Sequence, residues 1–473
     1  MVKFIGVQLG SHSVFDEGPD HCLDILQEHG GINAVFAYAT TYQGFSKGRT
    51  LGALAPDHGV PPKDGSNREL TQVWFTPHEE YYAGSLLRHD AARAQGEFAG
   101  RDVLAELAEP VRQRGMKLYA RILEGFGADL PARIPHWPQV LTIDIYGRPN
   151  HLPCFNNPLY RAWWSATVED LFKSYPLDGF KYGAERSGPL VNVLSGAYHG
   201  GEVPTCFCEH CQARARAKGI HVERARQGFQ ELYELLVGLE SGRAAPTDGI
   251  LITVLRLLLK YPEVLAWEYL WYESKEDLAK LLYGTIKAIK PQAQVGWHLY
   301  HNGTTWLPIH RAEVDYAELV PYSDWLKPVV YHDIAGPRIR RDIARLHQRV
   351  LREISERQYL ELLYDIMGYD KAAEPGLDEL MTTGLSPDYV YRVTHQCVAG
   401  VGGRIPVYPG VGFDIPWNNE HFHSDPDKVY QATLKAFEAG AQGLIVSREY
   451  DEMRLPNLQA VQRAVRDADA AGL

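Results

Sequence analysis

The sequence is poor in cysteine and has no long uninterrupted apolar stretch. Only six of the 473 residues are Cys, and three of them lie close together, so a disulfide framework is not expected. The most apolar tract, residues 249–271, contains four charged side chains, which argues against a membrane span. The chain begins with a predicted strand rather than a hydrophobic signal segment. We therefore expect a cytoplasmic enzyme, although a mature secreted form that has lost its signal would look the same.

Positive charge is also in short supply. Lys and Arg number 48 against 59 Asp and Glu, and the resulting net charge of −11 argues against a nucleic-acid-binding protein. No glycine-rich dinucleotide-binding motif follows the first predicted strand, which counts against a Rossmann fold. We find no internal repeat or low-complexity linker. The composition, 45% apolar and 23% charged, is that of a globular protein, and we predict one catalytic domain over residues 1–473.

What the sequence does contain is a series of short apolar runs, most of them followed by an amphipathic helical pattern. Continuous apolar strands alternating with helices indicate a parallel sheet covered on both faces. Eight such units favour an α/β fold of the closed (β/α)₈ type, a TIM barrel, over an open sheet. The predicted strands are Phe4–Leu9, Ala34–Ala39, Lys117–Ile122, Gly179–Tyr182, Val295–Tyr300, Leu326–Tyr331, Ile405–Tyr408 and Gly443–Val446.

The runs are unevenly spaced, and the longest gap lies between the fourth and the fifth. Extra length in such barrels usually enters through the loops that follow the strands, which also build the active-site face. We predict an inserted helical region with a metal-binding loop over residues 186–275. Its tract 250–272 is more apolar than one helical face requires. It is either a helix buried against the barrel or the contact surface of a homo-oligomer.

Carboxylates follow several of the predicted strands, at the end where barrel enzymes carry out their chemistry. Glu185 follows the fourth strand among four small residues that leave room for a ligand. Asp333, Asp414 and Glu449 follow the sixth, seventh and eighth strands. Glycoside hydrolysis requires two carboxylates, so we predict Glu185 as the acid and one of the other three as its partner. Each could instead cap a helix or form a structural ion pair.

Aromatic, His and Arg side chains at the same strand ends are candidate substrate contacts. Aromatic rings stack on sugar faces, and His and Arg bind hydroxyl groups or shift the pKa of a nearby carboxyl group. Arg121 and Glu124 end the third strand. The predicted substrate-binding residues are Tyr182, Arg186, Trp297, His298, His301, Tyr331, His332, Arg448 and Tyr450, with Trp417 as a further stacking residue.

The motif Cys206-Phe-Cys208-Glu-His-Cys211 predicts a metal site. Three thiolates so close in sequence can bind one ion, and zinc favours tetrahedral thiolate sites. Cys154 is the natural fourth ligand. His210 in its place, or a reduced cluster without metal, are the alternatives. Four protein ligands leave no open coordination position, so such a zinc would be structural.

The order Cys154, Glu185 and then Cys-x-Cys-x₂-Cys resembles the family-42 β-galactosidases, which are retaining (β/α)₈ glycosidases. The resemblance covers residues 150–215 and implies that Glu185 is the general acid/base and that Cys154, Cys206, Cys208 and Cys211 bind zinc. The sequence departs from that pattern in two ways. Ala184 stands where that clan has Asn, and the nearest carboxylate after the seventh strand is Asp414 rather than Glu.

More broadly, the segments GFKYGAERSGPL, CFCEHC and SREYDEM resemble hypothetical glycosyl-hydrolase-like barrels over most of the chain. The leading hypothesis is therefore a glycoside hydrolase with a carbohydrate substrate and no nucleic-acid or membrane partner. A divalent-metal-dependent sugar isomerase or epimerase is the alternative, with Glu185, His298, Asp333 and Glu449 as ligands of Mn²⁺ or Mg²⁺. A third hypothesis, based on the missing Asn, is a non-catalytic carbohydrate-binding barrel.

Overall fold

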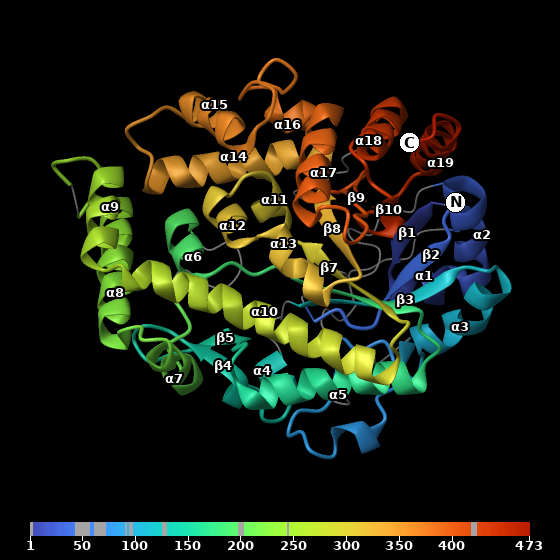
Figure 1. Cartoon of the computed structure of the whole chain (residues 1–473), viewed down its shortest axis with the longest axis horizontal. Coiled ribbons are helices and arrows are strands. Elements are labelled where there is room, and N and C mark those ends of the chain that lie inside the picture. Colours follow the sequence, from blue (N-terminus) through green and yellow to red (C-terminus); the bar gives the residue numbers. More distant parts are fainter. Residues whose placement is uncertain are drawn as a thin grey trace.

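Eight parallel strands form a sheet that closes on itself (Figure 1). The structure, a computed structural model, describes residues 3–42, 57–60, 72–89, 92–93, 98–124, 130–196, 203–243, 246–417 and 423–473. The strands, in their order around the sheet, are β10 (Gly443–Val446), β1 (Phe4–Leu9), β2 (Ala34–Tyr38), β3 (Lys117–Glu124), β6 (Gly179–Ala184), β7 (Gln294–Leu299), β8 (Trp325–Val330) and β9 (Gly410–Val411).

The two ends of this order also meet. Gly412 forms a parallel bridge with Ser447, and the Ser447 backbone N–H donates to the Val411 carbonyl at 2.9 Å. The sheet is therefore a closed barrel, and the predicted (β/α)₈ fold is confirmed.

Aromatic side chains fill one end of the barrel interior. Phe36, Tyr119 and Trp325 form a buried cluster there. Phe4 and Tyr408 pack against the cluster and stack on each other with ring centroids 4.5 Å apart. The barrel is thus packed at this end, and its opposite end carries the polar groups described below.

Helices surround the barrel, and a two-stranded hairpin, β4 (Leu141–Ile143) with β5 (Pro149–Pro153), lies beside it. Several helices begin with a proline behind a capping side chain: Asn157 accepts from the Leu159 N–H, and Asp425 accepts from the Asp427 N–H. The helices are α1 (Ser11–Glu17), α2 (Pro19–Gly30), α3 (Val103–Gln113), α4 (Leu130–Arg133), α5 (Pro158–Ser174), α6 (Pro189–Ser195), α7 (Glu209–Ala217), α8 (Val222–Glu240), α9 (Ile250–Lys260), α10 (Glu263–Ile289), α11 (His301–Thr305), α12 (Pro308–Glu313), α13 (Tyr316–Leu319), α14 (His332–Arg349), α15 (Glu356–Met367), α16 (Leu380–Thr383), α17 (Pro387–Val401), α18 (Pro426–Glu438) and α19 (Leu455–Ala470).

The seventh strand differs from its predicted position. Within the predicted run 405–408, Val407 makes only an isolated bridge to Leu326, and regular pairing with β8 begins at Gly410. The reason is local, because Pro406 and Pro409 have no N–H to donate to a neighbouring strand. The strand that pairs regularly is therefore short and follows the second proline.

The connection between β6 and β7 is the long one, and it contains α6 to α10 (Figure 1). Helix α9 buries Ile250 and Val254, and on its other side it exposes Leu251, Ile252, Leu255 and Leu259. The expectation that this tract is simply a helix buried on the barrel is therefore incomplete. Among the described residues, no helix is both long enough and apolar enough to cross a bilayer.

Candidate active site

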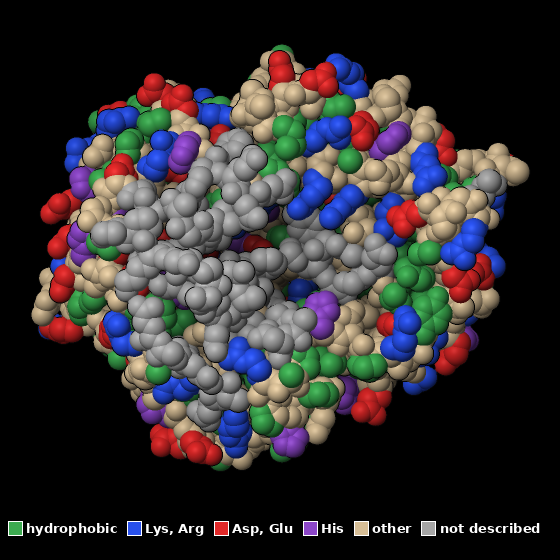
Figure 2. All heavy atoms as spheres, turned by 180° about the vertical axis from the view of Figure 1, so that it is seen from behind, with side chains coloured by type: hydrophobic (Ala, Val, Ile, Leu, Met, Phe, Trp, Pro, Cys, Tyr) green, Lys and Arg blue, Asp and Glu red, His purple; other side chains and the backbone are tan. Residues whose placement is uncertain are grey.

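The strands are parallel, so their carboxyl ends meet at one mouth of the barrel. Figure 2 shows a hollow in which acidic, basic and histidine side chains are visible. The residues that follow β6, β7, β8, β9 and β10 include most of the side chains predicted to form the site.

Glu185 directly follows β6, and its side chain is 28% exposed. One of its carboxyl oxygens lies 2.9 Å from Nε2 of His298, a buried residue of β7. Burial, together with the nearby positive charge of Lys327, lowers the pKa of His298 to about 3. The ring is therefore neutral at physiological pH. His298 therefore contacts Glu185 as a hydrogen-bond partner rather than as a charged ion-pair partner.

Glu449 follows β10 and is 6% exposed. Its carboxylate accepts a hydrogen bond from the hydroxyl of Tyr38, the last residue of β2, and another from the backbone N–H of Glu452, with which it forms a capping box. The guanidinium group of Arg121, on β3, lies 3.6 Å above the Tyr38 ring. A carboxylate held in this way, next to a cation, suits the role of nucleophile or base.

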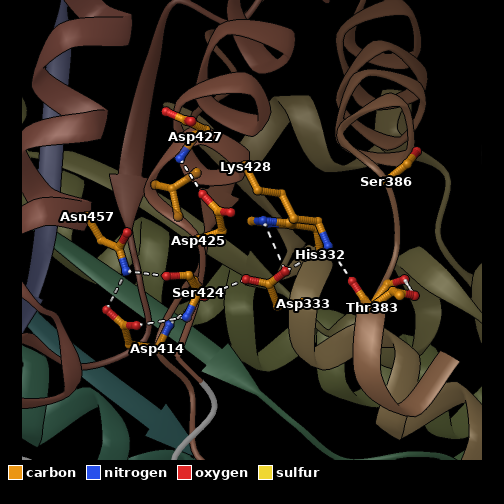
Figure 3. A network of polar contacts seen from close by, with 12 residues as sticks. His332, Asp333, Thr383, Ser386, Asp414, Ser424, Asp425, Asp427, Lys428 and Asn457 are labelled. Atoms are coloured by element: carbon orange, nitrogen blue, oxygen red, sulfur yellow. Dashed lines mark hydrogen bonds and ion pairs between the residues drawn. The ribbon is translucent and has the colours of Figure 1, made fainter. Parts of the chain in front are cut away.

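The carboxylate oxygens of Asp414 are hydrogen-bonded to other residues of the protein. It is 1% exposed, and its two carboxylate oxygens accept hydrogen bonds from the backbone N–H groups of Ser424 and Arg454 and from the side chains of Arg454 and Asn457 (Figure 3). These donors belong to the loop before α18 and to the start of α19. Asp414 therefore fastens those segments to the end of β9.

Asp333 belongs to the same network of hydrogen bonds and ion pairs. It accepts from the Ser424 hydroxyl, and Lys428 of α18 lies 3.0 Å from its other oxygen (Figure 3). The neighbouring charges of His332 and Lys428 hold the pKa of Asp333 below its usual value although burial acts in the opposite direction. His332 is itself fully buried beside this carboxylate, at 3.5 Å. Neither side chain is open to a sugar in this arrangement.

Tyr182 and Trp297 lie on the outside of the barrel. Successive strand residues point to opposite faces, and Lys181 and His298 point inward. Tyr182 packs edge-on against Trp164 of α5, and the Trp297 indole N–H donates to the Tyr322 carbonyl. Both line a pocket between the strands and α10. They do not make the stacking contacts at the mouth that we expected from the sequence.

Other side chains that we predicted to contact the substrate instead bond to neighbouring residues of the protein. Arg186 is buried and pairs with Glu124 at 2.9 Å, and it also donates to the Pro153 carbonyl. Tyr450 is fully buried and donates to Glu17 of α1. The Nε of Arg448 donates to Glu452 at 3.0 Å. These side chains stabilise the segments behind the candidate carboxylates.

Tyr331 and His301 remain at the mouth. The Tyr331 hydroxyl accepts from Lys327 at 3.2 Å. The His301 ring packs against Tyr331, and its nitrogens face Arg338 at 2.9 Å and the Tyr389 hydroxyl at 3.1 Å. Trp417 lies under the guanidinium group of Arg341.

Sequence reasoning missed a polar layer inside the barrel. The side-chain oxygen of Gln8 accepts hydrogen bonds from the amino groups of both Lys181 and Lys327. Each of the three residues is a polar interruption in an otherwise apolar strand. A charged residue within a buried strand must have a partner, so this signal was present in the sequence.

The four cysteines of the predicted metal site come together. Their sulfur atoms all lie within 4.8 Å of one another, and Cys154 Sγ is 3.5 Å from those of Cys208 and Cys211. Zinc–thiolate bonds of ~2.3 Å in a tetrahedron require sulfur atoms about 3.8 Å apart, so the arrangement fits such an ion. His210 is not part of the cluster and pairs with Glu209.

The closed barrel defines the chain as a (β/α)₈ protein. Neither a family model nor a curated protein matches the sequence. Among solved structures, the chain is similar to a β-galactosidase from the psychrophilic Marinomonas ef1 (TM-score 0.51, 10% identity, 99% of this chain and 59% of that one). It is also similar to a β-galactosidase from the Antarctic haloarchaeon Halorubrum lacusprofundi (TM-score 0.52, 13% identity, 98% and 58%). The chain thus spans less than two thirds of these relatives, and at such identity the similarity establishes the fold.

Proposed function

We propose that the protein is a glycoside hydrolase in which Glu185 is the general acid and Glu449 the second carboxylate. The observation that carries this proposal is the contact between the partly exposed Glu185 and a neutral, buried His298 at the barrel mouth. Glu185 can donate a proton to the glycosidic oxygen while Glu449 acts as nucleophile or base. We assign these roles to Glu185 and Glu449 rather than to Asp333 and Asp414, because Asp333 and Asp414 are tied together through Ser424 in one network.

The geometry gives less support to the isomerase alternative. That mechanism needs several donor atoms converging on one divalent ion. In the described part of the chain, the cysteine cluster is the one group of His, Cys, Asp and Glu donors close enough to share an ion. Asp333, one of the four ligands proposed from the sequence, is held by Ser424 and Lys428 instead.

We further propose that Cys154, Cys206, Cys208 and Cys211 bind one structural zinc ion. Backbone and side-chain N–H groups already point at the cluster: Ile143 donates to Cys206, and Asn156 donates to Cys211. Such bonds orient thiolate ligands around a metal. The ion would tie the β4–β5 hairpin region to α7 and would take no part in the reaction.

The substitution Glu185→Gln tests the hydrolase proposal. We expect the fold and substrate binding to persist and the rate to fall by roughly 10²–10⁴, the usual contribution of general acid–base catalysis. The loss should be smaller for aryl glycosides whose leaving group needs no protonation. Steady-state kinetics on a panel of glycosides provide the measurement.

Asp333→Asn is the matched control, because it also changes a carboxylate beside a barrel strand. Its folded fraction should retain activity within a few-fold. Near-full turnover of Glu185→Gln on a glycoside with a poor leaving group would contradict the assignment. Absence of any turnover by the wild-type protein across the panel would instead favour the carbohydrate-binding barrel.

A further inference from the structure

The barrel mouth concentrates cations in a protein whose net charge is −11. Within the described residues, four basic side chains of the mouth make no ion-pair contact with a carboxylate, although Glu185 and Glu449 act on the two lysines among them. The four are Arg121, Lys181, Lys327 and Arg338. In an acidic protein, basic side chains gathered at one concave site favour a ligand of the opposite sign.

The two lysines of this group are buried close to each other. Lys181 and Lys327 are 1% and 0% exposed, and both donate to the same oxygen of Gln8. Burial and the charge of Arg121 hold the pKa of Lys327 at about 7, and burial together with Lys327 and Arg121 holds that of Lys181 well below its usual value. Glu185 and Glu449 are the anions that act on this pair, so the anionic group of a ligand falls to the arginines rather than to the lysines.

Arg121 has unused hydrogen-bonding capacity. Its side chain is buried, at 3% exposure for the residue, and its guanidinium group stacks on the Tyr38 ring. Two of its nitrogens, Nε and Nη1, have no hydrogen-bond partner. A buried guanidinium group with free N–H donors is a strong site for a carboxylate or a phosphate.

Arg338 approaches the mouth from the other side. It belongs to α14, is half-buried, and donates through Nη1 to Nδ1 of His301 at 2.9 Å. Its guanidinium group also lies 5.9 Å from the centre of the Tyr331 ring. The charges of Arg338 and Arg121 both lower the pKa of Tyr331, against the larger effect of burial.

We infer that the hydrolase binds an acidic sugar, whose anionic group is received by Arg338 and Arg121 beside Glu185 and Glu449. This inference rests on the proposed function and adds the substrate class to it. The planar fork of an arginine donates two parallel hydrogen bonds to a carboxylate, a sulfate or a phosphate, and a neutral sugar offers no such partner. The two mouth carboxylates repel the anionic group, so it should settle on the arginine side of the site.

The test measures binding separately from catalysis. Glu185→Gln protein is titrated calorimetrically with D-glucuronate, D-glucose 6-phosphate, D-glucose, and inorganic phosphate. We expect one of the acidic sugars to bind about tenfold or more tightly than glucose, and the comparison of the two identifies the anionic group. Adding Arg338→Met should remove that preference. Arg340→Met is the matched control, because Arg340 lies on the same helix but pairs with Glu356. Arg338 is preferred to Arg121 for substitution because it is only half-buried.

Equal affinity for glucose and both acidic sugars would overturn the inference, as would an unchanged preference in Arg338→Met. Inorganic phosphate binding as tightly as the acidic sugars would also overturn it, since the site would then hold an adventitious ion only. Activity assays on wild-type protein separate the two proposals. If acidic sugars bind but no glycoside is cleaved, the hydrolase proposal fails while the binding site stands. If neutral glycosides are cleaved and acidic ones are neither bound nor cleaved, the substrate class fails alone.

Discussion

Four carboxylates near the strand ends differ in what their oxygens already bind. Glu185 contacts a neutral imidazole, and Glu449 accepts from a tyrosine hydroxyl. Asp333 and Asp414 are instead joined through Ser424 in one network (Figure 3). A carboxylate whose lone pairs are already used to hold the chain contributes to stability rather than to chemistry.

Asp414→Asn should therefore reduce stability and leave catalysis nearly intact. The amide group would replace one oxygen with a donor and leave buried N–H groups of Arg454 and Asn457 without an acceptor. We expect a loss of about 1–3 kcal/mol in the free energy of unfolding. Urea unfolding followed by fluorescence gives the measurement, with exposed Asp378→Asn, which pairs with exposed Arg357, as the control. A variant of normal stability but without activity would return Asp414 to the list of catalytic candidates.

Glu268 gives a pH dependence that can be tested. It lies in α10 and accepts from the backbone N–H groups of Leu190 and Val191 at the start of α6, which follows Glu185 closely. Burial raises the pKa of Glu268 to about 7. A carboxyl group whose pKa is higher in the folded than in the unfolded state stabilises the fold at low pH, and this contribution is lost as the pH rises from about 4.5 through 7.

Glu268→Gln should remove this dependence, which is worth roughly 2–3 kcal/mol. The urea midpoint of the wild-type protein should therefore fall more between pH 5 and pH 8 than that of the variant. Glu361→Gln, at an exposed position of α15, should behave like the wild type. Parallel pH profiles for wild type and Glu268→Gln would show that this group is not the cause.

The positions of Tyr182 and Trp297 show what the sequence could not reveal at this scale. Barrel strands are apolar on both faces, so a run of apolar residues does not say which of them face inward. Lys181 held the missing information, because an amino group inside an apolar strand has to reach polar partners in the barrel interior. Because Lys181 points into the barrel, its neighbour Tyr182 must point outward, against the helices.

Among the elements, the cysteine loop depends on long-range contacts. Cys154 follows β5, and the other three cysteines lie 52 to 57 residues further along the chain, yet the sulfur atoms converge. The C-x-C-x₂-C spacing was sufficient to predict a site. The fourth ligand was a choice between Cys154 and His210, and the fold favours Cys154.

Cys208→Ser should lower metal content and stability together, because binding a structural ion contributes directly to the folding free energy. We expect a lower melting temperature with little change in substrate preference. Elemental analysis and thermal unfolding are the measurements. Cys397→Ser is a suitable control, since this buried thiol of α17 lies outside the cluster and its loss should leave the metal bound. Wild-type protein purified without any metal would refute the zinc proposal.

The seventh strand shows where the prediction of a strand from a run of apolar residues fails. The run at 405–408 has the composition of a strand, but Pro406 within it and Pro409 just after it lack the N–H groups that pairing needs. Two glycines after the run then allow neighbouring side chains to approach the backbone closely. A Cβ atom on Gly410 would lie 2.5 Å from the Lys327 side chain, and one on Gly412 would lie 2.4 Å from Tyr331. The position of this strand is set by packing that a local pattern does not encode.

For the whole molecule, the eight apolar runs were sufficient to predict the barrel, because alternation of strands and helices leaves few other topologies. The mouth was harder to predict. Its polar groups come from strands far apart in the sequence, such as Gln8, Lys181 and Lys327, and no local spacing connects them. The sequence therefore gave a better account of the scaffold than of the site.

The exposed apolar side chains of α9 predict that the chain associates with itself. With Leu259 at 84% exposure and Leu251, Ile252 and Leu255 beside it, α9 presents an apolar face that soluble monomers seldom leave uncovered. We expect the chain to self-associate at micromolar concentration through this face. Sedimentation velocity should show a larger species in the wild type and a monomer in the double variant Leu255→Glu, Leu259→Glu. Leu362→Glu, on exposed α15, is the control, and a monomeric wild type would end the proposal.

The pairing of β1 with β10 has a consequence for how the molecule is made. Phe4 pairs with Gly443, so the two strands that close the barrel are roughly 440 residues apart. Ribosomes add about 5–20 residues each second, and the open edge of β1 must therefore wait roughly 20–90 s for its neighbour. An unpaired strand edge invites association with other chains. Glu449 follows β10 and arrives equally late, so the nascent chain would pass through its most aggregation-prone interval before it could have any activity.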